Sequence, residues 1–82
     1  MNSDDFRILL AAVDKKVDIV TTEGEHFVAR VVWIDEEHSE LVFDLITTSM
    51  PELYKQIGQT NEQGTYSMPF SYISRVQVCQ RD

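Results

Sequence analysis

Residues 17–35, VDIVTTEGEHFVARVVWID, decide the fold, because they follow the period of two that β-strands impose on a sequence. Residues 17–22 are rich in β-branched side chains and predict a first strand. The segment 23–25 predicts a turn, in which Gly24 supplies the permissive backbone. Residues 26–34 predict a second, longer strand. An antiparallel hairpin is therefore expected here.

The longer strand is apolar on both of its sides. The first side carries Phe27, Ala29, Val31 and Trp33, and the second carries Val28, Val32 and Ile34. A strand that is apolar on both sides is usually buried on both. In a small barrel this occurs when a long strand bends and contributes to both halves of the core. We therefore expect this strand to bend.

Downstream of this hairpin, the strand pattern is interrupted once. Residues 48–64 form the interruption, and Pro51 suits the first turn of a short helix over residues 50–57. Pro69 removes a ladder donor, so the strand that contains it is expected at an edge or at a bend. The remaining predicted elements are a polar turn at 35–39, strands at 41–47, 65–70 and 73–79, and a tight turn at 71–72.

Upstream of the hairpin, residues 3–14 predict an amphipathic helix. Ser3 is the expected N-cap, and Asp4 and Asp5 lie where the helix dipole favours anions. One apolar stripe at helical spacing is expected to cover one end of the sheet; it contains Phe6, Leu9, Leu10 and Val13. At the other end of the chain, Val76 and Val78 are expected to point inward from the last strand.

The order of these elements resembles the Sm-like family. Gly24 and Asp35 stand where the first motif of that family has its turn glycine and its aspartate. The resemblance implies a mainly β fold: a small, five-stranded, bent antiparallel barrel with an N-terminal helix and a short helical insertion between strands three and four. SH3-like barrels share this layout, and the sequence pattern leaves both topologies open.

Several positions that bind RNA in Sm-like proteins carry other residues here. Ala29 stands in place of a glycine of the bent strand, and Ser39 aligns with the asparagine that contacts a nucleobase. Residues 70–72, FSY, stand in place of the Arg-Gly signature. The resemblance therefore implies the fold, whereas the RNA contacts do not carry over.

Length and charge narrow the class of protein and of partner. The 82 residues are interpreted as one domain, residues 1–82. The formal net charge is −7, and residues 1–44 hold eleven of the fourteen acids but four of the seven bases. An acidic surface repels phosphate backbones and anionic membranes. The charge is interpreted either as serving solubility alone or as an acidic face that docks on a basic protein. Because Cys79 is alone, no internal disulfide supplements the small core, and a homo-oligomer formed through the edge strands is expected.

The sequence also predicts a cytoplasmic location. No apolar run approaches the ~20 residues that span a bilayer, and the first residues are acidic where a signal peptide is basic. A lone cysteine fits a reducing compartment.

No catalytic, cofactor or metal site is predicted. Cys79 has neither a glycine elbow nor a neighbouring histidine to support a nucleophile. His26 and His38 are expected to be solvated residues near turns, and the acids around His38 match no defined metal loop. The candidate interaction surface consists of an acidic turn and an aromatic cluster: Asp35, Glu36 and Glu37 in the first, and Tyr54, Tyr66 and Tyr72 in the second.

Two functions remain open on this basis. The first is a non-enzymatic module for protein interaction or self-assembly, with an acidic face. The alternative is an Sm-like RNA-binding protein or regulator that lacks the usual RNA-contact residues, and it rests on likeness of fold alone.

Overall fold

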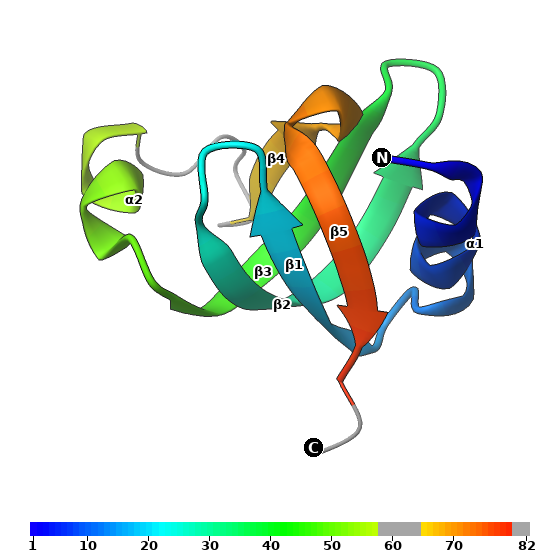
Figure 1. Cartoon of the computed structure of the whole chain (residues 1–82), viewed down its shortest axis with the longest axis horizontal. Helices are drawn as coiled ribbons and strands as arrows, with labels where there is room; N and C mark the ends of the chain where they lie inside the picture. The colour runs from blue at the N-terminus through cyan, green and yellow to red at the C-terminus, as the bar shows by residue number, and fades with distance from the viewer. Residues whose placement is uncertain (58–64, 80–82) are drawn as a thin grey trace.

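Five strands make up most of the regular structure in the computed structural model, which describes residues 1–57 and 65–79. The elements in chain order are α1 (Ser3–Ala11), β1 (Lys16–Thr21), β2 (His26–Asp35), β3 (Glu40–Thr48), α2 (Pro51–Ile57), β4 (Tyr66–Pro69), the 3₁₀ turn η1 (Phe70–Tyr72) and β5 (Ile73–Val78). All strands pair antiparallel in one sheet, in the order β4-β3-β2-β1-β5 (Figure 1). The predicted N-terminal helix, the five antiparallel strands and the short helix between strands three and four are confirmed.

The sheet is curved but not closed. Its two edge strands are β4 and β5, and no pairing joins them among the residues that the structure describes. The predicted barrel is therefore not confirmed, and the observed architecture is a curved five-stranded sheet. Pro69 lies on an edge strand, as predicted, where a residue without an N–H is tolerated. Residues 58–64 of the predicted insertion lie outside the described residues.

The central strand β2 changes face part-way along its length. Phe27, Ala29 and Val31 are buried, but the register against β3 then shifts between Val31 and Trp33, and Ile34 is the next buried residue. One extra residue in a strand moves every following side chain to the opposite face and bends the strand. The predicted bend is thus present. The prediction that Trp33 lies on the same side of the strand as Phe27 was wrong, because the shift turns Trp33 outward, where it is 61% exposed.

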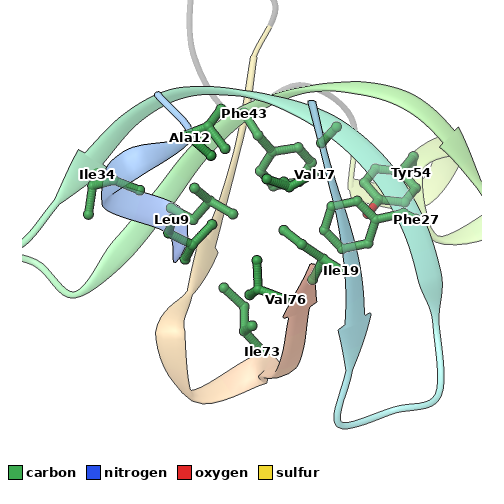
Figure 2. Close-up of a cluster of buried hydrophobic side chains, with 13 residues drawn as sticks. Leu9, Ala12, Val17, Ile19, Phe27, Ile34, Phe43, Tyr54, Ile73 and Val76 are labelled. Atoms are coloured by element: carbon green, nitrogen blue, oxygen red, sulfur yellow. The ribbon is translucent and has the colours of Figure 1, made fainter. Parts of the chain in front are cut away.

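The core lies inside the curve of the sheet. Figure 2 shows strands arching over a cluster that receives Leu9 and Ala12 from α1, Ile73 and Val76 from β5, and Phe27 and Phe43 from the central strands. The rings of Phe27 and Phe43 stack at 5.1 Å between centroids. Helix α1 therefore completes the core on the side where the sheet remains open.

Helix α1 differs from its predicted form at both ends and in its buried face. The N-cap is Asn2, whose Oδ1 accepts from the Asp5 amide at 2.8 Å, so the prediction of Ser3 was wrong by one residue. The helix ends at Ala11, and Asp14 takes a left-handed backbone with φ of 70°. The buried face contains Asp5, Leu9 and Ala12, whereas Leu10 and Val13 of the predicted stripe are exposed.

A hydrogen bond between Asp5 and β5 explains this rotation of the helix. Asp5 Oδ1 accepts from the Val76 amide at 3.1 Å, and the Asp5 side chain is buried against the strand. Val76 pairs with Ile19 of β1, but its amide is directed at the helix instead of the sheet. The carboxylate thus satisfies a donor on an edge strand that would otherwise be buried without a partner.

The inward direction predicted for β5 holds only in part. Val76 is buried, as predicted, but Val78 is 48% exposed. Val78 pairs with the buried Val17, so it faces the core side of the sheet. Its exposure follows from its place as the last residue of an edge strand.

The turn residue Gly24 has φ of 89°, in agreement with the predicted need for a permissive backbone there.

Replacement of Asp5 by Ala is expected to lower the free energy of unfolding by about 1–3 kcal/mol, because it leaves the buried Val76 amide without an acceptor. Asp4→Ala is the matched control: Asp4 lies in the same helical turn but is exposed, and its loss is expected to change stability by at most about 0.5 kcal/mol. Urea denaturation of both variants measures the difference. Equal effects of the two substitutions would contradict the assigned role of Asp5.

Candidate functional site

The junction between β3 and α2 is tied to the start of β2. The Ser49 amide donates to the His26 carbonyl at 2.9 Å, and the Ser49 hydroxyl accepts from the His26 amide at 2.9 Å. The Met50 amide donates to Thr48 Oγ1 at 3.0 Å, which turns the chain into α2. These bonds fix the helix at one end of the sheet, far from α1 in the view of Figure 1. Tyr54 of α2 is consequently held against the core and is 8% exposed.

A row of aromatic rings leads from the core towards this end of the molecule. The Phe43 ring stacks on Tyr66 with centroids 6.0 Å apart, and Tyr66 meets Tyr54 edge-to-face at 5.0 Å and 82°. Figure 2 shows the Tyr54 ring at the margin of the core, beside Phe27. The two ends of the row, Phe43 and Tyr54, are buried, and Tyr66 between them is half-buried. Stacked and edge-to-face pairs of this kind stabilise a fixed ring arrangement.

The rings open onto a cleft of about 390 Å³. Its walls come from the β1–β2 turn, β3, α2, β4 and η1, and they include Tyr54, Tyr66 and Tyr72. The three tyrosines that the sequence suggested as an aromatic cluster therefore share one concave surface. The rest of the wall is largely apolar, and its charged members are Glu23 and Glu25 from the turn. Concave, mostly apolar surfaces with a few polar groups are the usual form of binding sites.

Glu25 is a member of this site that sequence analysis missed. The sequence places it in the turn at 23–25 and gives it no role, yet only 2% of it is exposed. Its backbone pairs with Thr21, whose amide donates to the Glu25 carbonyl at 2.8 Å and whose hydroxyl accepts from the Glu25 amide at 3.1 Å. The side chain turns inward, and its Oε2 accepts from the Thr48 hydroxyl. The signal in the sequence for this placement is weak: it consists of Thr21 and Thr48, which end β1 and β3 and can hydrogen-bond a nearby glutamate.

The Tyr54 hydroxyl lies near this carboxylate but is not fully satisfied. It is buried, and it makes no hydrogen bond of standard geometry with the described residues. Burial, followed by its interaction with Glu25, raises the pKa of Tyr54 well above its ordinary value of 10.0. A buried hydroxyl without a full hydrogen bond costs free energy. The inner end of the cleft therefore combines a buried carboxylate with a buried hydroxyl, and the described residues leave that hydroxyl without a hydrogen bond of standard geometry.

The acidic part of the predicted surface lies elsewhere. Asp35, Glu36 and Glu37 occupy the end of β2 and the β2–β3 turn, which Figure 1 places on the α1 side of the molecule, away from α2. Glu36 and Glu37 are exposed. The structure therefore separates the predicted surface into two, an aromatic cleft and an acidic turn.

Within the acidic turn, Asp35 is used to hold the backbone. Its Oδ1 accepts from the His38 amide at 3.1 Å, and its Oδ2 lies 2.8 Å from His38 Nδ1. The hydrogen bond from the His38 ring is the main reason that the pKa of Asp35 lies below its ordinary value of 3.8. Ser39 then closes the turn with φ of 56°. This local arrangement leaves Glu36 and Glu37 as the solvated charges of the turn.

In the described part of the chain, the other titratable side chains form no cluster suited to catalysis or metal binding. His26 lies 3.4 Å from Asp18 on the exposed surface of β1 and β2. Cys79 is half-buried just after β5 and is a free thiol. Within residues 1–57 and 65–79, no three His, Cys, Asp or Glu side chains come together as ligands for a metal ion.

Comparisons with known proteins add no assignment. No family model matches the sequence, and no curated protein or solved structure matches it either. None of the described helices has the length and apolar character needed to cross a bilayer. The function of the chain is therefore inferred from the geometry of the cleft itself.

The Asp35–His38 contact gives a pH prediction. Because the pKa of Asp35 is lowered in the folded state, its ionised form stabilises the protein above pH 3.8, and that stabilisation is lost as the pH falls through the lowered pKa. Replacement of His38 by Ala is expected to move the Asp35 pKa part of the way back towards 3.8. Carboxyl-detected NMR titration measures both values. An unchanged Asp35 midpoint in the variant would show that the ring contributes nothing.

Thr48→Val is expected to lower the free energy of unfolding by about 1–3 kcal/mol, because it removes a hydroxyl donor from the buried Glu25 carboxylate while keeping the shape of the side chain. Thr47→Val is the matched control on the exposed face of the same strand, and its expected effect is within about 0.5 kcal/mol. Chemical denaturation compares the two. A Thr48→Val protein as stable as the control would mean that Glu25 does not depend on this bond.

Proposed function

We propose that this chain is a non-enzymatic protein-interaction module whose binding surface is the aromatic cleft. The observation that carries the proposal is the convergence of Tyr54, Tyr66 and Tyr72, from three separate elements, on one concave surface. Tyrosine is enriched in protein interfaces and among their energetic hot spots. Such rings contribute a large contact area at a low cost in side-chain entropy.

The chemistry at the cleft favours binding over catalysis. A general acid or base works best when its pKa lies near the working pH. The pKa of Tyr54 is instead moved upward, away from neutrality, by burial and by Glu25. Of the described histidines, His26 lies against Asp18 and His38 against Asp35. The residues at the cleft thus suit contact with another molecule better than proton transfer.

For the architecture, we propose an Sm-like fold. The strand order β4-β3-β2-β1-β5, the helix ahead of β1 and the bent second strand all support it. In Sm-like rings, the edge strands of neighbouring subunits pair. Here the Val76 amide of the β5 edge already donates to Asp5. That bond favours a different protein as partner over a ring of identical subunits.

Charge favours a protein partner over RNA. Glu23 and Glu25 at the cleft would repel a phosphate backbone, and the net charge of −7 acts in the same direction. The exposed Glu36 and Glu37 on the acidic turn add a second surface of the same sign. Both surfaces suit a partner with basic residues.

Affinity capture with immobilised protein tests the proposal. The unaltered chain is expected to retain partner proteins from a lysate of the expressing cells. The Tyr72→Ala variant is expected to retain at least about tenfold less of them, since interface aromatics often contribute more than 1.4 kcal/mol. Tyr72 is 50% exposed, so its loss should leave the fold intact. Trp33→Ala is the matched control, because Trp33 is an exposed aromatic that does not line the cleft.

Two results would contradict the proposal. The first is equal retention of every captured protein by the unaltered chain and by Tyr72→Ala. The second is recovery that depends on RNA, shown by its loss after ribonuclease treatment. Light scattering of the purified chain separates self-assembly from capture of a different protein.

A further inference from the structure

Building on the proposed function, we propose that the cleft receives a cationic side chain, lysine or arginine, from the partner protein. In this arrangement the charge of the guest lies against the Glu25 carboxylate, and its aliphatic stem lies against the tyrosine rings. The proposal identifies the chemistry of the partner residue, which the shape of the cleft alone does not define.

The Glu25 carboxylate is a buried acceptor at the inner end of the cleft. A carboxylate offers about four acceptor positions on its two oxygens. At 2% exposure, Glu25 has little access to water, and the described side chains that interact with its carboxylate are the neutral hydroxyls of Thr48 and Tyr54. A buried charge is costly unless it is paired or fully hydrogen-bonded. A cation that enters the cleft would give the Glu25 carboxylate an opposite charge. Binding would therefore lower the free-energy cost of burying that carboxylate.

The Tyr54 hydroxyl, which interacts with Glu25, is the second polar group at the inner end of the cleft. Tyr54 is 8% exposed and its hydroxyl is buried, yet the described residues offer it no hydrogen bond of standard geometry. Its oxygen has lone pairs that can accept from an ammonium or guanidinium N–H. Tyr54 and Glu25 are close enough to interact, so one neutral and one charged oxygen can meet the same incoming N–H donor.

The rings are arranged to hold a cation with its stem. Tyr54 and Tyr66 meet nearly at right angles, 82°, with centroids 5.0 Å apart, and so form two walls of a corner. A cation within about 6 Å of a ring centroid is attracted by the π-system. Met50 and Leu53, both partly exposed, line the same cleft and can cover the methylene groups of a long side chain.

Other classes of guest fit less well. An acidic side chain would be repelled by Glu23 at the rim and by Glu25 inside. A purely apolar side chain would displace water from the cleft without satisfying either polar group. Among the side chains that the structure describes, no lysine or arginine lines the cleft. The proposal assigns the cation to the partner protein.

NMR titration with defined peptides tests the inference on the intact chain. The probes are blocked pentapeptides with a central lysine, arginine, acetyl-lysine or glutamate between glycines. The lysine or arginine peptide is expected to shift the amides of Glu23, Glu25, Tyr54 and Tyr66 in a saturable way. The acetyl-lysine peptide, which keeps the stem but loses the charge, and the glutamate peptide are expected to bind at least about tenfold more weakly. Comparison of the lysine and arginine peptides identifies the preferred cation.

Charge-removing variants assign the effect to the cleft. Glu25→Gln is expected to weaken the best peptide about tenfold. Glu23→Gln, at an exposed position, gives a second reading that does not depend on a buried substitution and is expected to weaken it about twofold. Glu37→Gln on the acidic turn is the matched control and is expected to leave affinity unchanged. Equal binding of the lysine and acetyl-lysine peptides, or full affinity in both cleft variants, would overturn the inference.

Failure of this inference can be told apart from failure of the proposed function. If Tyr72→Ala loses the captured partner but charge has no effect on peptide binding, the cleft binds proteins by other contacts and only the cation assignment is wrong. If Tyr72→Ala retains every partner, the proposed function is wrong as well. Peptide shifts confined to the acidic turn, at Glu36 and Glu37, would also contradict the cation assignment.

Discussion

The register shift in β2 is the constraint on which the rest of this structure depends. β2 lies at the centre of the sheet, so its shape is passed to β1 and β3 on either side. The shift between Val31 and Trp33 bends the strand and exchanges its faces, which allows Phe27 and Ile34 to enter the same core. A regular strand would place Trp33 inside and would keep the sheet flatter. The curve that results is what leaves one side of the core for α1 and one end for the aromatic cleft.

Two carboxylates resolve the consequences of that curvature. On the open side, Asp5 of α1 accepts from the Val76 amide and so covers part of the β5 edge. At the opposite end, Glu25 is drawn into the structure by the threonines at the ends of β1 and β3. Both are buried, but they differ in their surroundings. Asp5 accepts from a backbone amide of the fold itself, whereas Glu25 and its neighbour Tyr54 line a cleft, and the described residues give the Tyr54 hydroxyl no hydrogen bond of standard geometry.

This contrast links stability to the proposed role. Asp5 is bound within the fold by a backbone amide, whereas Glu25 lies in the wall of an aromatic cleft, where the proposed cation would meet it. The two surfaces suggested by the sequence also have different characters. The acidic turn uses Asp35 to hold its own backbone, while the tyrosines make up a recess in which charge and rings act together. The cleft is therefore the better candidate for recognition of a specific residue.

The sequence by itself determined the local elements: the turn at Gly24, the short helix with Pro51 in its first turn, and the five strands, with Pro69 expected at an edge or a bend. Each of these depends on backbone conformation or on short-range periodicity, which neighbouring residues set. Only the tertiary structure decided which face of α1 is buried, that Trp33 points outward, and that Glu25 lies inside. These outcomes depend on a one-residue register shift and on hydrogen bonds between residues 71 positions apart, as for Asp5 and Val76. Hydrophobic periodicity carries no record of such pairings, because a slip of one residue leaves the composition of a strand unchanged while it reverses every side chain.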